Sequence, residues 1–105
     1  MTKARPSVSV YLPTHNRAAL LARALESVLS QSFTDFELIV VDDGSRDDTP
    51  DIITRFCARD SRVKGLRTAE SQGAPAARNM AIRAASGTYI TGLDDDDEMR
   101  PQRIQ

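Results

Sequence analysis

The sequence is poor in cysteine and in long apolar runs, and both shortages exclude classes of protein. Its single cysteine, Cys57, has no partner for an internal disulfide, and the apolar helical pattern around it (Ile52, Ile53, Phe56) favours a small buried residue over a reactive thiol. No stretch approaches the roughly 20 apolar residues of a membrane span, and the N-terminus lacks the apolar core of a signal peptide. We therefore expect no transmembrane segment in this chain and a cytoplasmic location, or the inner face of the membrane for the full-length protein.

The chain also lacks an excess of charge of either sign. Its 14 basic and 15 acidic residues leave a formal net charge of -1, so nucleic-acid binding driven by bulk charge is not expected. The acidic residues are unevenly distributed, because 10 of the 15 lie in two short windows, 42–51 and 94–98. If the fold brings these windows together, they form a site for a cation.

The order of the sequence signals predicts an α/β fold. Strand-like and helix-like segments alternate along the 105 residues with short turns between them, which is the pattern of βαβ units. This favours one domain, 1–105, with a Rossmann-like, open, mostly parallel sheet of about four strands and helices on both faces. The expected strands cover residues 7–12, 37–43, 63–67 and 88–93, and the expected helices cover 17–30, 50–59 and 75–86.

Particular residues predict where these elements begin and end. The segment 13–16 (Pro-Thr-His-Asn) is expected to break the first strand, with Asn16 capping the helix that follows. Thr49 is expected as the N-cap of the second helix, with Pro50 at its first position. Gly87 is expected to close the third helix in a left-handed conformation.

The topology places the most polar of these turns on one rim. Right-handed crossovers between parallel strands bring the strand carboxyl ends, and hence 13–16, 42–45 and 94–97, to the sheet edge where ligands bind in open α/β folds. Four consecutive aspartates repel one another, and Mg²⁺ or Mn²⁺ would offset that repulsion because both ions prefer hard carboxylate oxygens. A calcium loop of the EF-hand type is a poor fit, because Met99 stands where that loop needs glycine. A solvated acidic turn is the alternative.

Three further residues are candidates for binding a nucleotide. Asp42, at a strand end before Gly44, can accept a hydrogen bond from a nucleobase N–H, although Asp-Gly turns are common in all proteins. Arg78 lies in the first turns of a helix, where the dipole disfavours a cation, so either a phosphate or nucleotide partner explains it or it is an ordinary surface arginine. His15 can stack on a base or hydrogen-bond a phosphate, or it is a loop histidine without a ligand.

Five motifs in this order resemble a known family. They are P-T-x-N-R (13–17), S-V-L-x-Q-x-F, D-D-G-S (42–45), G-x-x-x-A-R-N (73–79) and D-x-D-D (94–97). From about residue 7 to residue 104 the chain is similar to the nucleotide-binding half of family 2 glycosyltransferases, which have the A-type glycosyltransferase (GT-A) fold.

The resemblance implies an activity and roles for residues. The activity is inverting, metal-assisted transfer of a sugar from a nucleoside-diphosphate sugar, most readily a UDP-sugar, to a hydroxyl of an acceptor glycan or lipid-linked sugar. Asp96 would be the main ligand of Mn²⁺ or Mg²⁺ with support from Asp94, and Asp95 would lie near the ribose. The other implied nucleotide-binding residues are Pro13, Thr14, His15, Asn16, Asp42, Asp43 and Arg78.

The chain departs from the family pattern in two places. Members often carry an aromatic residue, commonly tyrosine, at the position of His15. Their general base is a carboxylate well downstream of the D-x-D-D motif, and no Asp or Glu lies in 99–105, so no catalytic base is expected in this chain and one is expected C-terminal to Gln105. We therefore expect a truncated part of a longer glycosyltransferase that is inactive in isolation, and self-association through its truncated edge is a hypothesis.

Three other classes of protein share some of these sequence features. A non-catalytic nucleotide-binding or regulatory module of the same fold is the main alternative. A phosphoacceptor receiver domain is disfavoured, because the Asp pair ends the second strand and the last lysine, Lys64, precedes the fourth. A nucleotidyltransferase would favour a basic, glycine-rich loop after the first strand, which 13–16 does not supply.

Overall fold

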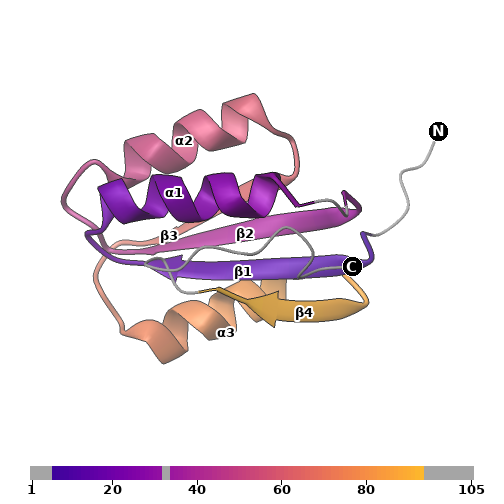
Figure 1. The fold of residues 1–105 in the computed structure, drawn as a ribbon. Helices are drawn as coiled ribbons and strands as arrows, with labels where there is room; N and C mark the ends of the chain where they lie inside the picture. The colour runs from indigo at the N-terminus through magenta and orange to yellow at the C-terminus, as the bar shows by residue number, and fades with distance from the viewer. Residues whose placement is uncertain (1–5, 32–33, 94–105) are drawn as a thin grey trace.

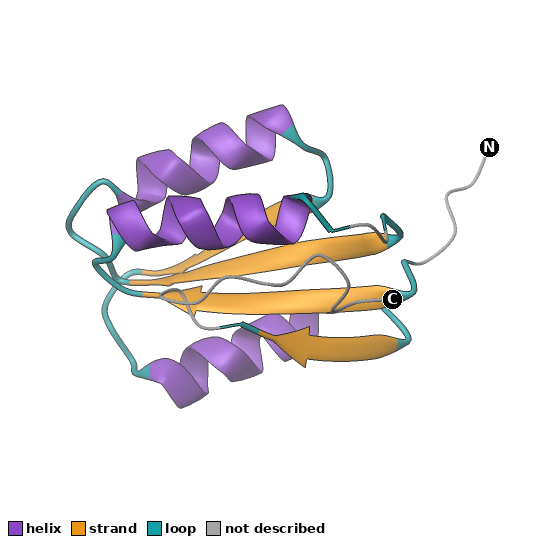
Figure 2. Cartoon of the chain, viewed as in Figure 1, coloured by secondary structure: helices purple, strands orange, loops and turns teal. Residues whose placement is uncertain are grey.

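The computed structural model describes residues 6–31 and 34–93, and in them strands and helices alternate as predicted. The four strands form one parallel sheet in the order β3-β2-β1-β4, so the prediction of an open, Rossmann-like α/β fold is confirmed. Helices α1 and α2 cover one face of the sheet and α3 covers the other (Figures 1 and 2). The elements are β1 (Val8–Thr14), α1 (Ala18–Leu29), β2 (Phe36–Asp43), α2 (Thr49–Arg59), β3 (Val63–Thr68), α3 (Ala74–Ala84) and β4 (Tyr89–Gly92).

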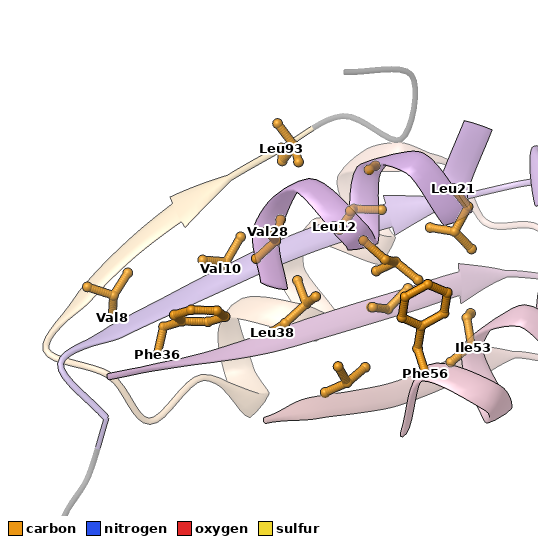
Figure 3. Packing of buried hydrophobic residues seen from close by; sticks show 14 residues of the cluster. Val8, Val10, Leu12, Leu21, Val28, Phe36, Leu38, Ile53, Phe56 and Leu93 are labelled. Carbon is orange, nitrogen blue, oxygen red and sulfur yellow. The ribbon is translucent and has the colours of Figure 1, made fainter. Parts of the chain in front are cut away.

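Strand β2 is the most deeply buried element of the sheet. All eight of its residues are buried, because β1 and β3 flank it and helices cover both of its faces. Alternate side chains point to opposite faces. Phe36, Leu38 and Val40 join the larger core under α1 and α2 (Figure 3), while Ile39 and Val41 pack with Ala77 and Ala81 of α3.

Strand β1 is longer than predicted, because it continues through Pro13 to Thr14. Pro13 pairs with Val41 and Thr14 with Asp42. The backbone carbonyl of Tyr11 faces β4 and accepts from Leu93, and by alternation the backbone of Pro13 faces the same side. The described pairing of β1 with β4 ends at Tyr11, so the missing N–H of Pro13 removes no ladder hydrogen bond there.

The predicted helix caps at Asn16 and Thr49 are wrong. Arg17 precedes α1 and Asp48 precedes α2, and neither side chain makes a capping hydrogen bond. Asp47 supplies the acceptors instead: its Oδ2 accepts from the backbone N–H of Ala18 at 3.2 Å and its Oδ1 from that of Thr49 at 2.9 Å. The carboxylate of Asp47 therefore accepts a hydrogen bond from a backbone N–H in the first turn of each of the two helices. Pro50 lies in the first turn of α2, as predicted.

The predicted left-handed cap at Gly87 is also wrong. Helix α3 ends at Ala84 with an extended Ala85, and Gly87 does not have a positive φ. Glycine is needed there for a different reason: a Cβ at this position would lie 2.6 Å from the backbone nitrogen of Ser9. The chain after α3 therefore passes directly against β1, and the N–H of Gly87 donates to Ser9 Oγ at 2.8 Å.

No helix in the described part of the chain is long and apolar enough to cross a bilayer. The edge strand β4 carries the most exposed large apolar side chains, Tyr89 at 71% and Ile90 at 45%. Cys57 was predicted to be buried, and it is partly buried, with its side chain packed against the larger core. This burial raises the pKa of its thiol.

Candidate functional site

Three loops meet at the carboxyl edge of the sheet, as the topology predicts (Figure 1, left). They follow β1, β2 and β3, and together they line a pocket of about 540 Å³. The lining contains both polar and apolar groups. The lining residues are His15, Asn16, Gly44, Arg46, Ala69, Glu70 and Ser71.

Asn16 joins the first two of these loops. Its φ of 52° lies in the left-handed region, which asparagine adopts more readily than most residues. In this conformation its backbone N–H donates to Ser45 Oγ at 2.8 Å, and its Oδ1 accepts from the backbone N–H of Arg46 at 2.7 Å. The predicted turn at 13–16 is thus a single tight corner at 15–16, held against the loop after β2.

The His15 ring is fixed by the same loops. Its Nδ1 lies 2.6 Å from the carbonyl oxygen of Asp43, and because a carbonyl only accepts, Nδ1 carries the proton. In the neutral ring Nε2 is then the acceptor, and it faces the amide nitrogen of Asn16 at 3.1 Å. The ring stays exposed beside the pocket, so its face is open to a ligand.

Asp43 uses its carboxylate to hold the loop that precedes α3. Oδ1 accepts from Thr68 Oγ1 at 2.9 Å and the N–H of Gln72 at 2.8 Å, and Oδ2 accepts from Ser71 Oγ at 3.0 Å and the N–H of Gly73 at 2.9 Å. Burial raises the pKa of this carboxyl, but the four donors outweigh burial and lower the pKa below its usual value. Both oxygens are thus engaged by the protein, which favours a positioning role for Asp43.

Gly44 is required by the closeness of two loops. Its φ is +69°, and a Cβ at this position would lie 2.5 Å from the backbone nitrogen of Ser71 and 2.8 Å from the carbonyl carbon of Glu70. The sharp turn predicted from the D-D-G-S motif is therefore present. It lets the loop after β3 approach the end of β2 and close one side of the pocket.

Asp42 points to the opposite face from Asp43 and is almost completely buried, with 1% of its surface exposed. Its Oδ1 accepts from the N–H of Ser45 at 2.9 Å. Its Oδ2 is buried without a hydrogen-bond partner, and Nε of Arg67 lies 3.6 Å away. An unsatisfied buried carboxylate oxygen is costly, so this atom is the most unusual polar group of the described site.

The remaining predicted residues lie around or outside this site. Arg78 is exposed in the second turn of α3, and no hydrogen bond or ion pair joins it to another described residue. Asp94, Asp95 and Asp96 lie outside the described residues, which end with Leu93 just after β4. Within 6–31 and 34–93, no group of three or more His, Cys, Asp or Glu residues is placed to hold a metal ion.

Two contacts at this edge of the sheet were not predicted from the sequence. Arg67 was expected only as the end of a strand, yet it is the register partner of Asp42 across β2 and β3. Asp47 was noted only as one of the acidic residues in the window 42–51, yet its carboxylate accepts a hydrogen bond from a backbone N–H at the start of both α1 and α2. Strand register could have pointed to Arg67. The contact of Asp47 with Thr49 is local and could have been read from the sequence, but its contact with Ala18, 29 residues away, could not.

Known proteins are similar to most of this chain. The profile of glycosyl transferase family 2 matches residues 9–105. The chain belongs to this family. Over 95 residues it is 42% identical to the GalNAc(5)-diNAcBac-PP-undecaprenol beta-1,3-glucosyltransferase of Campylobacter jejuni, an alignment that covers 90% of this chain and 31% of that protein.

Solved structures share the fold and are GT-A glycosyltransferases. S. aureus TarS 1–349 in complex with UDP matches with a TM-score of 0.85 and 30% identity, over 92% of this chain and 29% of that one. The mannosyltransferase PcManGT of Pyrobaculum calidifontis, in complex with GDP-Man and Mn²⁺, matches with a TM-score of 0.80 and 31% identity, over 89% of this chain and 28% of that one. The chain spans 31% to 40% of the length of four curated relatives.

Proposed function

We propose that this chain is the donor-binding part of a glycosyltransferase that uses a nucleoside-diphosphate sugar, with a UDP-sugar as the expected donor. The observation that carries the proposal is the buried, unsatisfied Oδ2 of Asp42 at the carboxyl edge of the sheet. A ring N–H of a nucleobase is a suitable partner, because it supplies the missing donor without adding charge. Family membership and the UDP and GDP-Man complexes of structural neighbours support the same assignment.

The other residues of the rim would complete the nucleotide site. The exposed ring of His15 offers a face for the base, and Asn16 shapes the corner where base and ribose meet, next to Pro13 and Thr14 at the end of β1. Arg78 has no described partner, and it would lie near the nucleotide. Asp43 would act by fixing the loop before α3 rather than by touching the nucleotide.

A divalent cation, Mn²⁺ or Mg²⁺, is expected at the D-x-D-D motif, with Asp96 as main ligand, Asp94 as support and Asp95 near the ribose. The donor set fits such a cation because carboxylates are hard oxygen ligands. β4 runs parallel to β1, so the chain reaches residue 94 from the carboxyl end of a strand. When bound, the cation would neutralise charge on the departing diphosphate.

The acceptor side of the reaction is expected beyond this chain. An inverting transfer needs a base that takes the acceptor proton, and we expect a carboxylate C-terminal to Gln105 to supply it, with a glycan or lipid-linked sugar as acceptor. The chain by itself should therefore bind the donor without transferring sugar. We expect the whole protein to act in the cytoplasm or at the inner membrane face, and self-association through the truncated edge of this chain stays a prediction.

The role of Asp42 can be tested by calorimetric titration of the Asp42→Ala chain. We expect its affinity for UDP to fall by roughly 10-fold or more, the effect of losing one hydrogen bond to a charged group, while its affinity for inorganic diphosphate is unchanged. Asp48→Ala is the matched control, since Asp48 is exposed in the same loop and its side chain makes no cap. If the affinities for UDP and for diphosphate fall equally, Asp42 does not contact the base.

A further inference from the structure

Arg67 is the one cation placed beside the unsatisfied oxygen of Asp42 among the residues that the structure describes. The two residues are register partners on β2 and β3, so their side chains leave the sheet on the same face. The Arg67 side chain is 56% exposed, whereas that of Asp42 is 2% exposed. The pair therefore sets a buried acceptor next to an accessible set of donors.

In the chain without ligand, a second contact holds the guanidinium. One terminal nitrogen of Arg67 donates to the carbonyl oxygen of Ser45 at 3.2 Å, and the N–H of the same serine donates to Asp42 Oδ1. Ser45 lies between Gly44 and Arg46, which line the pocket. Asp42 and Arg67 are thus tied to one loop of the pocket, and the guanidinium keeps N–H groups that no described residue accepts.

We infer that Arg67 is a specificity-determining residue of the donor site, which with Asp42 selects bases carrying a ring N–H next to a ring carbonyl. This inference rests on the proposed function, because it requires that a nucleobase meets Asp42. Uracil, thymine and guanine carry that pair of groups, so the N–H reaches Asp42 while Arg67 donates to the neighbouring carbonyl. Cytosine and adenine carry an unprotonated ring nitrogen and an exocyclic amine at those places.

Binding of a base would also give Asp42 Oδ2 the hydrogen bond that it lacks in the chain without ligand. At 3.6 Å, Nε of Arg67 is too far from Asp42 Oδ2 for a hydrogen bond, and the oxygen is closed to solvent. A base that reaches Oδ2 must shift the guanidinium, and the shift disturbs little buried surface because the side chain is more than half exposed. The loose ion pair is then replaced by two hydrogen bonds to one base.

The test compares UDP with CDP, which differ only at the base edge, by calorimetric titration into the chain with Mn²⁺. We expect the unsubstituted chain to prefer UDP, and Arg67→Met to lose roughly 10-fold in affinity for UDP with little change for CDP. Arg67→Lys keeps the charge beside Asp42 but not the planar fork, so it should retain the melting temperature and lose part of the UDP preference. Arg83→Met, an exposed arginine in the last turn of α3, is the control.

The possible outcomes distinguish a failure of the inference about Arg67 from a failure of the proposed function. If Arg67→Met binds UDP as tightly as the unsubstituted chain or more tightly, Arg67 only covers Asp42 and the inference is wrong. If both Arg67 variants lose UDP and CDP equally, Arg67 acts on the diphosphate or on folding, and the inference is again wrong. If the folded, unsubstituted chain binds no nucleotide, the proposed function itself fails.

Discussion

The two ends of β2 carry buried carboxylates on the same face of the sheet, and their surroundings differ. At the amino end Glu37 accepts from Ser9 Oγ at 2.5 Å, from the N–H and Oγ of Ser86 at 2.6 and 2.9 Å, and from Lys64 Nζ at 2.6 Å. At the carboxyl end Asp43 also accepts four hydrogen bonds, but no described lysine or arginine pairs with it. The two carboxylates hold the segments that leave and enter α3.

The difference separates a closed end of the sheet from an open one. Burial raises the pKa of Glu37, but Lys64 and the donors from Ser9 and Ser86 outweigh burial and lower the pKa to about 2. Its charge is thus neutralised within the fold. At the other end lie two carboxylates, Asp42 and Asp43, and among the described residues only the half-exposed Arg67 forms an ion pair with either of them. The amino end needs no ligand, whereas the carboxyl end has an unsatisfied acceptor and a pocket.

The largest expected effect on stability is at the closed end. Glu37→Ala removes the acceptor of four donors, and we expect it to lower the free energy of unfolding by about 3 kcal/mol in urea titrations. Lys64 can reach solvent, which limits the loss. Glu26→Ala, which breaks an exposed pair with Arg59, should cost less than about 1 kcal/mol. If both variants lower the free energy of unfolding by similar amounts, the hydrogen bonds of Glu37 do not stabilise the fold more than an exposed ion pair does.

At the open end the same kind of change should affect stability and binding together. In Asp43→Asn the amide NH₂ replaces an oxygen that faces donors, so we expect a loss of about 2 kcal/mol and weaker nucleotide binding, because the loop before α3 loses its anchor. The two readouts are urea titration and calorimetry with UDP. Full UDP affinity in a destabilised variant would argue against a positioning role for Asp43.

A pair of glycine substitutions sharpens the comparison. A Cβ at Gly44 would lie 2.5 Å from Ser71 N, and one at Gly87 would lie 2.6 Å from Ser9 N. We expect each alanine variant to lose about 1–2 kcal/mol of stability, measured by urea titration, and the positive φ adds strain only at Gly44. Only Gly44→Ala should also weaken UDP binding. If the two variants weaken UDP binding equally, the nucleotide site is not confined to the carboxyl end of the sheet.

The last effect is a pH dependence of the free energy of unfolding. The pKa of Glu37 is about 2 in the folded chain against an ordinary value of 4.5, so its contribution to stability is complete above about pH 4.5 and is lost as pH falls toward 2. In Glu37→Gln, stability should therefore change less between pH 5 and pH 2 than in the unsubstituted chain, which acid-range urea titrations would measure. Parallel pH profiles would mean that Glu37 keeps its ordinary pKa.

The fold was predictable from the sequence because its signals are local. Strand-like and helix-like apolar patterns alternate along the chain and identify the elements, and the continuous run in β2 matches a strand covered on both faces. Helix starts were less predictable, since Asn16 and Thr49 are good capping residues but Asp47 takes that role, through a local contact at Thr49 and through a contact made by the fold at Ala18. Gly87 was misread for the same reason, because it is required by contact with β1 rather than by a turn.

The candidate site was predictable in position but not in detail. The rim follows from parallel topology alone, and it brings 13–16 and 42–45 together. Strand alternation implies that the two carboxylates of D-D-G-S point to opposite faces, but the motif does not reveal that the carboxylate of Asp43 is saturated with donors while Asp42 has an oxygen without a partner. Arg67 was missed because its link to Asp42 depends on the register between β2 and β3, which no local pattern encodes.

The central claim, that the open end of the sheet binds a donor nucleotide, is tested most directly by calorimetric titration of UDP into this chain with and without Mn²⁺, with GDP and dTDP as comparators. The account predicts saturable binding of UDP that strengthens when Mn²⁺ is present. Absence of binding for all three nucleotides to the folded chain, with or without Mn²⁺, would contradict it.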